Sequence, residues 1–378
     1  MTKPRPRVVT VLPGLAHGGA EIGVLRVLGA TTTDFDHRVI ALRAGGRLGA
    51  AFRAAGIDVV EVEMGRPLAW PAHAHQLARA ITSFGPQLIS AHMHRPALIT
   101  TAVHQLVARD VPLVWNFHAT LSEVTRMRLA GRLAIVACRL LAGSARRIVY
   151  VGERSANDHL QRGYPRAKAV LLPNGIDLAR YRPDDDAALR LRRDWGFAVD
   201  DVVIGHVARP SWIKDHGLML AAFGIAAARD GRLRAVFCGP DSETLPVPAH
   251  LRSRIRVLGL RDDVAAVMSA TDIGCLSSRS GESLPTVLIE FMACQRPCVS
   301  TDVGDAAAIV GDLGRVVPPR DAAALAEAIL ALSALSREQR SELGRLARDS
   351  IARRFEIGAV AARHAALWRE LIAGAARS

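Results

Sequence analysis

The chain has 378 residues, half of them apolar, and a formal net charge of +13. A single hydrophobic core seldom serves so long a chain, so we expect two domains of ordinary size. No apolar run reaches the roughly 20 residues of a membrane-spanning helix, and no signal peptide is visible, so we do not expect an integral membrane protein. The five cysteines lack the paired spacing of a zinc site, which predicts buried, reduced thiols and no metal.

Strand-like and helix-like segments alternate through the first half of the chain. Strands are predicted at residues 7–12, 38–42, 58–62, 88–91, 113–116, 147–151 and 169–172. Amphipathic stretches lie between them, such as residues 21–28 and 48–55. This alternation predicts a parallel sheet covered by helices.

The second half repeats the alternation after a linker. Pro173 to Asp186 is rich in Pro, Asn, Gly and Asp, so we place the linker there. Further strands are predicted at residues 202–207, 234–238, 255–258, 273–276, 297–301 and 315–317. A last helix is predicted at residues 359–375. The sequence therefore predicts two α/β domains.

The positive charge lies mainly in the first half. Residues 1–180 contain 23 Lys and Arg against 11 Asp and Glu, a balance of +12, and the remainder has a balance of +1. This half is therefore expected to meet an acidic partner, such as anionic lipid, a lipid-linked diphosphate or nucleic acid.

The strongest basic stretch begins at Thr125 and ends at Arg147. Its helical spacing predicts one basic face and one apolar face, formed respectively by Arg128, Arg132, Arg139 and by Leu129, Leu133, Val136, Leu140. Such a helix is typical of contact with an anionic membrane surface. A solvated outer helix is the alternative.

Two glutamates eight positions apart, Glu282 and Glu290, stand in SGESLPTVLIEFMACQRPCV. Glu290 falls inside an apolar run, where a carboxylate is costly unless it is paired or hydrogen-bonded. Carboxylates accept hydrogen bonds from the vicinal hydroxyls of a ribose or hexose. Pro285 can occupy the first turn of the following helix, whose free N–H groups attract phosphate. We interpret the segment as a nucleotide-sugar pocket; the alternative is an acid in a loop and an acid in a helix that is capped by a nearby arginine.

Other candidates follow predicted strands. Arg209 and Lys214 lie five positions apart after the strand at 202–207 and could clamp a diphosphate, although ordinary surface cations are the alternative. Gly18 and Gly19 permit close backbone approach to a ligand between the first strand and first helix. His118 could bind a sugar hydroxyl or position an acceptor.

His92 and His94 also lie at a strand end and could line the acceptor side. They are spaced like a metal pair, but no third ligand is evident, so we predict no metal site.

These segments resemble, in the same order, the motifs of the retaining glycosyltransferases of family 4, which have the GT-B architecture. The matching stretches are HGGAE (17–21), NFHAT around His118, PNGID (173–177), HVARPSWIKDHGLML (206–220), LGLRDDVAAVMSATDI (258–273), the two-glutamate segment and DVGDAAAIVGDLGRVVPPRD (302–321). The resemblance implies an α/β fold with two Rossmann-like domains facing across a cleft. It implies an acceptor domain at 1–178, a donor domain at 179–358 and a C-terminal helix, 359–378, that crosses back to the first domain.

The resemblance also implies roles for single residues. Glu290 would bind the ribose, and Glu282 the donor hexose. Arg209 and Lys214 would neutralise the leaving diphosphate, while His118 would lie close to the transferring sugar. The remaining implied contacts are to phosphates, sugar and base, from Gly18 and Gly19, from the backbone near Leu284, Thr286 and Val287, and from Val257 and Leu258. Ser283 stands where the family usually has glycine, which leaves the donor preference open.

The predicted function is transfer of a hexose-type sugar from a UDP-, GDP- or ADP-sugar, without a metal, to a lipid-linked or polysaccharide-precursor acceptor. We expect it in cell-envelope or exopolysaccharide synthesis, in the cytoplasm, with peripheral contact to the inner face of the plasma membrane as a second expectation. A nucleotide-sugar epimerase or phosphorylase of the same architecture is the alternative. A nucleic-acid-binding protein is disfavoured because basic residues are not interleaved with aromatic ones.

Overall fold

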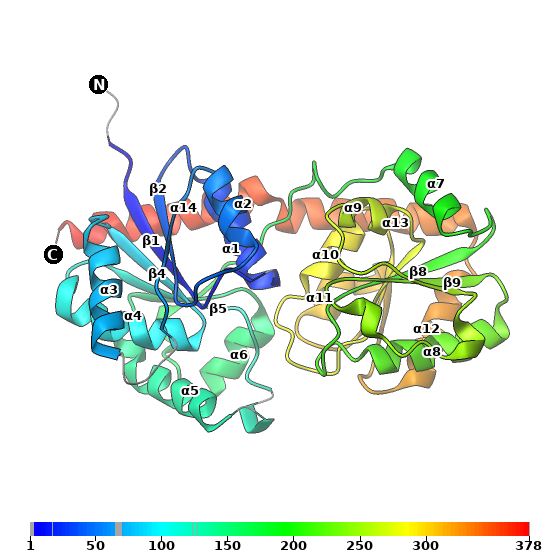
Figure 1. Ribbon diagram of the computed structural model, residues 1–378, viewed down its shortest axis with the longest axis horizontal. Coiled ribbons are helices and arrows are strands. Elements are labelled where there is room, and N and C mark those ends of the chain that lie inside the picture. The colour runs from blue at the N-terminus through cyan, green and yellow to red at the C-terminus, as the bar shows by residue number, and fades with distance from the viewer. Residues whose placement is uncertain (1–3, 17, 65–69, 123, 127, 378) are drawn as a thin grey trace. The chain divides into compact units, whose positions relative to one another are not determined.

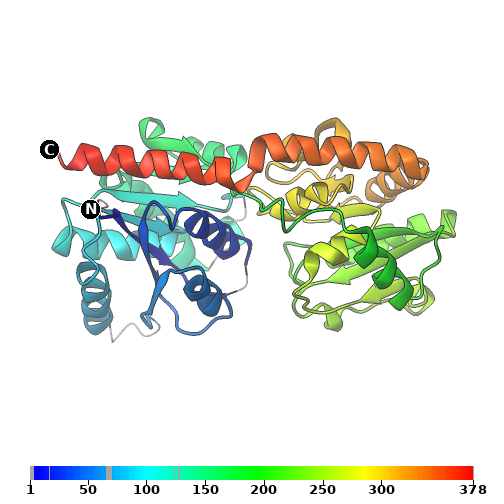
Figure 2. The ribbon, with the colours of Figure 1, turned by 90° about the horizontal axis from the view of Figure 1, so that it is seen from above.

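The computed structural model describes residues 4–377 apart from 17, 65–69, 123 and 127. It divides the chain into two compact units, Met1–Gly175 with Ile357–Ser378, and Ile176–Glu356. The chain thus passes between units within three residues of the predicted boundaries. The last helix, α14 (Ile357–Ala375), belongs to the first unit, where it packs against α1 (Figure 2).

The first unit contains a seven-stranded parallel sheet in the order β3-β2-β1-β4-β5-β6-β7. Its strands are β1 (Arg7–Leu12), β2 (Asp36–Ala41), β3 (Asp58–Glu61), β4 (Leu88–His92), β5 (Leu113–Phe117), β6 (Arg147–Tyr150) and β7 (Ala169–Leu171). Besides α14, its helices are α1 (Gly19–Ala30), α2 (Leu48–Ala54), α3 (Trp70–Thr82), α4 (His94–Val107), α5 (Leu129–Leu141) and α6 (Glu153–Gln161).

Both faces of this sheet are buried because its central strands are buried at successive positions, whose side chains point to opposite faces. One face packs against α3, α4 and α5, and the other against α1, α2 and α14 (Figure 1). The strand order reverses between β1 and β4. Ligands of open α/β sheets bind beyond the carboxyl ends of the strands at such a reversal.

The second unit contains a six-stranded sheet in the order β10-β9-β8-β11-β12-β13, again parallel. Its strands are β8 (Val202–Val207), β9 (Leu233–Cys238), β10 (Ile255–Val257), β11 (Ile273–Leu276), β12 (Cys298–Thr301) and β13 (Gly314–Val317). Its helices are α7 (Asp185–Asp194), α8 (His216–Arg229), α9 (Val264–Ser269), α10 (Thr286–Ala293), α11 (Ala306–Val310), α12 (Ala322–Ser333) and α13 (Arg337–Phe355). The order reverses between β8 and β11.

The predicted strands all occur, with ends displaced by two residues at most. The predicted linker is wrong at its end, because Asp185 already belongs to α7. Asp184 caps that helix by accepting a hydrogen bond from the Ala187 N–H, and acids in the first turn favour the helix dipole. The five cysteines, predicted to be buried thiols, are all buried and free.

Helix α10 lies very close to the second sheet. A Cβ added to Gly274 of β11 would come 2.7 Å from Cδ2 of Phe291, and one added to Gly205 of β8 would come 2.9 Å from Cε1 of the same ring. Phe291 is fully buried. The two glycines therefore set how closely α10 approaches the reversal of strand order.

We predict that Gly274→Ala lowers the free energy of unfolding by about 1–3 kcal/mol, because Phe291 must move to admit the methyl group. Urea denaturation measures this loss. The matched control is Gly231→Ala, where an added Cβ meets nothing within 4 Å. Equal stability of the two variants would show that α10 tolerates a larger separation from the sheet.

Candidate functional site

A lysine and a glutamate meet where β8 and β11 end in the second unit. Lys214 Nζ lies 2.5 Å from Glu282 Oε1, and the Ser278 hydroxyl donates to the same oxygen at 2.8 Å. The Glu282 side chain is 13% exposed and that of Lys214 27%. Both contacts use Oε1, so among the described residues Oε2 keeps its lone pairs for another donor. The structure brings these two predicted site residues together.

A second ion pair holds the Lys214 loop in place. Arg279 donates from Nε and Nη2 to Asp215 Oδ2, at 2.8 and 2.5 Å, and its guanidinium lies 4.8 Å from the centroid of the Trp212 ring. Asp215 has φ +46° and caps α8 by accepting from the Leu218 N–H. The Ser277 hydroxyl lies 2.9 Å from the Lys214 carbonyl oxygen. These contacts tie the loop after β8 to the loop after β11.

Sequence reasoning missed Asp215, Arg279 and Ser277. The aspartate before the apolar helical stretch was a visible capping signal. Its pairing with Arg279 was not visible, because the two residues are 64 positions apart.

Arg209 lies on the same loop as Lys214 but contacts a different acid. Its Nε is 3.8 Å from Asp241 Oδ2, and both side chains are exposed, by 53% and 72%. An exposed pair at this distance contributes little to stability. The Arg209 guanidinium can therefore exchange this partner for a ligand at small cost.

Glu290 lies on the open side of α10 and is only partly buried. Thr286, one turn earlier, is also partly buried, whereas Val287, Leu288 and Ile289 are buried. Glu290 therefore stands on the less buried side of α10, away from the face that carries Phe291. Pro285 is displaced from its predicted place, since it precedes the helix as its N-cap residue. The first N–H groups of α10, at Thr286 and Val287, have no acceptor within the helix.

The loop after β12 packs against the backbone of Glu282 and Ser283. Gly304 has φ +55°, and a Cβ there would come 2.7 Å from the Glu282 carbonyl oxygen. The Asp305 N–H donates to the Ser283 carbonyl oxygen at 2.8 Å. Ser283 is buried, and its hydroxyl has no partner among the described residues.

The predicted base-binding and sugar-binding positions occupy the same edge of the sheet. Val257 ends β10 and Leu258 follows it, both partly buried, and Leu284 is buried before α10. The loops after β8, β10 and β11 thus present cations, carboxylates and apolar side chains at the carboxyl ends of one sheet.

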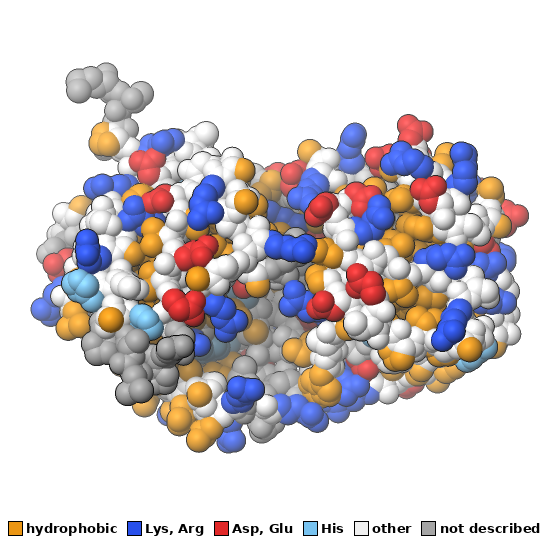
Figure 3. All heavy atoms as spheres, in the orientation of Figure 1, with side chains coloured by type: hydrophobic (Ala, Val, Ile, Leu, Met, Phe, Trp, Pro, Cys, Tyr) orange, Lys and Arg blue, Asp and Glu red, His pale blue; other side chains and the backbone are white. Residues whose placement is uncertain are grey.

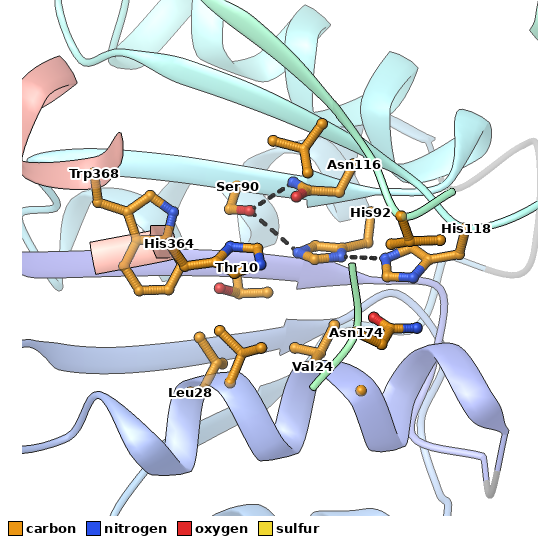
Figure 4. Close-up of a pocket in the computed structure, with 14 residues that line it drawn as sticks. Thr10, Val24, Leu28, Ser90, His92, Asn116, His118, Asn174, His364 and Trp368 are labelled. Atoms are coloured by element: carbon orange, nitrogen blue, oxygen red, sulfur yellow. Dashed lines mark hydrogen bonds between the residues drawn. The ribbon is translucent and has the colours of Figure 1, made fainter. Parts of the chain in front are cut away.

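In the first unit, a small pocket lined by both polar and apolar side chains lies at the corresponding reversal of strand order (Figure 4). His92 Nδ1 is 2.9 Å from His118 Nε2, and their rings stack at 5.1 Å. Ser90 Oγ lies 3.1 Å from His92 Nε2 and accepts a hydrogen bond from Asn116 Nδ2 at 2.9 Å. Thr10, Asn174 and His364 complete the polar lining.

Burial keeps the histidines of this pocket neutral near pH 7. It lowers the pKa of His118 to about 4 and that of His92 well below 6.5. The pKa of His364 falls to about 3 through burial and, secondarily, the proximity of His118. A neutral imidazole both donates and accepts, so His118 can bind a hydroxyl without carrying charge.

His94, predicted with His92 to line the acceptor side, is not part of this pocket. Its Nε2 lies 3.1 Å from His159 Nε2, and its ring stacks on Phe117 at 4.3 Å. Met93, with φ +71°, separates the two histidines by turning the chain from β4 into α4. In the described part of the chain, no group of three or more His, Cys, Asp or Glu side chains could hold a metal ion.

The glycine loop lies at the carboxyl end of β1. Gly18 is the N-cap residue of α1 and Gly19 is its first residue. The neighbouring histidine of the motif, His17, lies outside the described residues. Burial raises the pKa of the Glu21 carboxyl in the first turn of α1.

Two family models match the chain. The model described as Glycosyltransferase Family 4 matches residues 17–180, and the one described as Glycosyl transferases group 1 matches residues 201–334. The chain belongs to the family 4 glycosyltransferases. This confirms the resemblance drawn from its motifs.

Curated relatives have related descriptions. The putative glycosyltransferase EpsF of Bacillus subtilis (strain 168) is 29% identical over 325 residues, 80% of each chain. The putative teichuronic acid biosynthesis glycosyltransferase TuaC of the same organism is 28% identical over 65% of this chain and 60% of its own. The phosphatidyl-myo-inositol mannosyltransferase of Mycolicibacterium smegmatis is 28% identical over 64% of this chain and 61% of its own. The chain thus spans about three fifths of the last two relatives.

Solved structures share the fold. Anabaena HepE, solved in complex with UDP and glucose, matches with a TM-score of 0.84 at 20% identity, over 97% of this chain and 100% of its own. WaaG, a glycosyltransferase involved in lipopolysaccharide biosynthesis, matches with a TM-score of 0.73 at 14% identity, over 95% and 99%. The predicted fold class, two Rossmann-like domains of the GT-B type, is confirmed.

We predict that acidification from pH 6.5 to 5 destabilises the first unit through its buried histidines. The unfolded chain binds protons with the ordinary histidine pKa of about 6.5, whereas folded His118 resists protonation until about pH 4. Stability is therefore complete above pH 6.5 and falls by about 1.4 kcal/mol per pH unit for each such histidine. Thermal unfolding across this range measures the slope.

The His118→Asn variant should show a shallower slope, whereas His250→Asn, at an exposed position, should match the wild type. A wild-type slope retained in His118→Asn would contradict the assignment of His118 as a buried neutral group.

Proposed function

We propose that this glycosyltransferase is retaining and moves a hexose-type sugar from a nucleoside-diphosphate sugar to a lipid-linked or polysaccharide-precursor acceptor. The synthesis it serves would be that of cell-envelope or exopolysaccharide material, in the cytoplasm. The observation that carries the proposal is the Lys214–Glu282 pair at the start of α10, the helix that bears Glu290.

Each group of this site suits one part of a nucleotide sugar. Lys214 and Arg209 would neutralise the diphosphate, and the free N–H groups at the start of α10 would bind its oxygens. Glu290, on the open side of α10, would accept hydrogen bonds from the ribose hydroxyls. When a diphosphate attracts Lys214, the Glu282 carboxylate becomes free to bind hydroxyls of the donor sugar.

The proposed reaction needs positioning and electrostatic stabilisation. The bond between the anomeric carbon and the leaving phosphate oxygen breaks, and an acceptor oxygen bonds to the same face of that carbon. The acceptor proton passes to the departing phosphate. Neutral His118 is proposed to hydrogen-bond the transferring sugar, and no metal is proposed.

The donor nucleotide is proposed to be UDP, GDP or ADP. HepE was solved with UDP and glucose, which makes UDP-glucose the first donor to test. Ser283, with its buried hydroxyl in place of the family's usual glycine, stands where it would influence the choice of sugar.

We predict that Glu290→Gln weakens binding of the cognate nucleotide sugar by about 10- to 100-fold, because a charge-assisted hydrogen bond contributes about 1.5–3 kcal/mol. Thermal shift with a panel of UDP-, GDP- and ADP-sugars identifies the donor, and calorimetry measures the affinity. The matched control is Glu327→Gln, at an exposed glutamate of α12.

Equal affinity of Glu290→Gln and the wild type would contradict the assigned ribose contact. Net transfer of sugar to an added acceptor distinguishes a transferase from an epimerase, and phosphate-dependent turnover would indicate a phosphorylase.

We also propose that α5 rests on an anionic membrane surface. Four apolar side chains at helical spacing are solvent-exposed: Leu129 by 68%, Leu133 by 58%, Val136 by 48% and Leu140 by 72%. Arg128, Arg132 and Arg139 are exposed beside them, while Ile135 and Cys138 pack inward. Figure 3 shows apolar and basic side chains together on the surface near α5.

This combination suits the boundary between headgroups and acyl chains, where apolar side chains enter the bilayer and arginines bind anionic lipid. No described helix is both long enough and apolar enough to cross a membrane. Contact through α5 would bring the first unit to a lipid-linked acceptor.

We predict that the double variant Leu133→Asp, Leu140→Asp loses binding to vesicles of phosphatidylglycerol and phosphatidylcholine in co-sedimentation. Leu189→Asp, an equally exposed leucine on α7 of the second unit, is the matched control and should bind like the wild type. Binding should weaken with salt and with phosphatidylcholine alone. Undiminished binding by the double variant would contradict the proposal.

A further inference from the structure

We propose that Asn116, Ser90 and His92 form a hydrogen-bonded relay that fixes the tautomer and orientation of His118, with the His118 proton on Nδ1. Asn116, Ser90 and His92 would be positioning residues, because they act on a ligand only through His118. The consequence for catalysis rests on the proposed function; the relay itself does not.

Register places the relay on one face of the first sheet. His92 of β4 pairs with Asn116 of β5, and Thr10 of β1 pairs with Ser90. Side chains two positions apart on a strand share a face, so Ser90 and His92 point the same way. His118 follows β5 and meets His92 at the carboxyl end of that strand (Figure 4).

The Asn116 amide determines which atom donates in each hydrogen bond of the relay. The Asn116 amide nitrogen can only donate, so Ser90 Oγ accepts from it at 2.9 Å. The Ser90 hydroxyl proton is then available to His92 Nε2, 3.1 Å away. With Nε2 accepting, neutral His92 carries its proton on Nδ1 and donates to His118 Nε2 at 2.9 Å. Neutral His118 therefore carries its proton on Nδ1.

The reverse order would leave two members of the relay unpaired instead of one. If His92 Nε2 donated to Ser90, the buried Ser90 hydroxyl would have no acceptor among the described residues, and His118 Nδ1 would be an unpaired acceptor. In the first order only the His118 Nδ1–H group is unpaired. An unsatisfied buried polar group costs about 1–3 kcal/mol, which favours the first order. Burial lowers the pKa of both histidines, so neither is held as a doubly protonated ring near pH 7.

The end of the relay is an unused donor. His118 Nδ1 is buried and has no partner among the described residues, and the same is true of Thr10 Oγ1 in this pocket. Buried polar atoms are usually paired, so a donor left over on the lining of this pocket points to a ligand oxygen. The geometry thus presents one N–H group to a hydroxyl or phosphate oxygen, in a ring that cannot rotate without breaking the bond to His92.

The test is the tautomer of His118 in the full-length chain at pH 7.5 without ligand. Long-range ¹H–¹⁵N NMR of histidine-labelled protein distinguishes Nδ1–H from Nε2–H rings, with His118→Gln used to assign the signals. We expect His118 as the Nδ1–H tautomer. A wild-type His118 in the Nε2–H form would overturn the proposal, whatever the activity of the protein.

Two variants of His92 separate the relay from simple packing. His92→Asn keeps an amide donor near the position of Nδ1 and should retain the Nδ1–H tautomer of His118. His92→Phe keeps a ring but no donor and should yield a mixture of tautomers. An unchanged His118 signal in folded His92→Phe would also overturn the proposal.

If the proposed transfer reaction is correct, His92→Phe should lower kcat by roughly 10- to 100-fold with little change in the KM of the donor, as expected for a misplaced catalytic group. His92→Asn should recover most of that loss. Equal kcat values for His92→Phe and the wild type, with the tautomer changed, would count against the role of His118 in the reaction and leave the relay intact.

Discussion

Helix α10 approaches the second sheet so closely that the strands beneath it carry no side chain at the contact. Gly205 and Gly274 leave room for the Phe291 ring, and this contact fixes which side of α10 faces the sheet. Glu290 lies on the open side of α10, and the start of the helix lies next to the loop of Glu282. The positions of Glu282 and Glu290 thus depend on two glycines, Gly205 and Gly274, that have no chemical role.

The two units differ in the kind of polar side chain that lies at the carboxyl ends of their strands. In the second unit, charges are balanced in pairs, Lys214 with Glu282 and Arg279 with Asp215. A cation of such a pair can exchange its carboxylate partner for an anionic group of a ligand and stay paired with a negative charge. In the first unit, the pocket that α1 helps to line contains neutral imidazoles, two hydroxyls and two amides. This difference suits a charged nucleotide in one unit and sugar hydroxyls in the other.

Much of this was predictable from the sequence. Alternating strands and helices have distinct periods, so all strands were found and the fold class followed from their order. The capping aspartate at 184 was misread as linker, because acids favour both loops and helix starts. The apolar neighbours of Glu290 in the chain do not tell which side of the helix it occupies; only the packing of Phe291 shows which face of the helix is buried.

The relay was beyond sequence reasoning for a different reason. Ser90 and His92 are two positions apart on one strand, so they were recognisable as sharing a face, whereas Asn116 lies on β5 and His118 follows it. The contacts between these residues depend on the register between β4 and β5, which no local sequence pattern specifies. The Asp215–Arg279 pair could not be predicted for the same reason. Contacts within one element were predictable, and contacts between elements required the structure.

A crystal structure with an intact nucleotide sugar, UDP-glucose first, tests the central claim most directly. We predict that Lys214 Nζ leaves Glu282 Oε1 and contacts a phosphate oxygen, while Glu290 accepts hydrogen bonds from the ribose. Glu282 should then contact hydroxyls of the donor sugar. A nucleotide bound elsewhere, or bound with the Lys214–Glu282 pair intact and Glu290 without a ribose contact, would contradict the assignment.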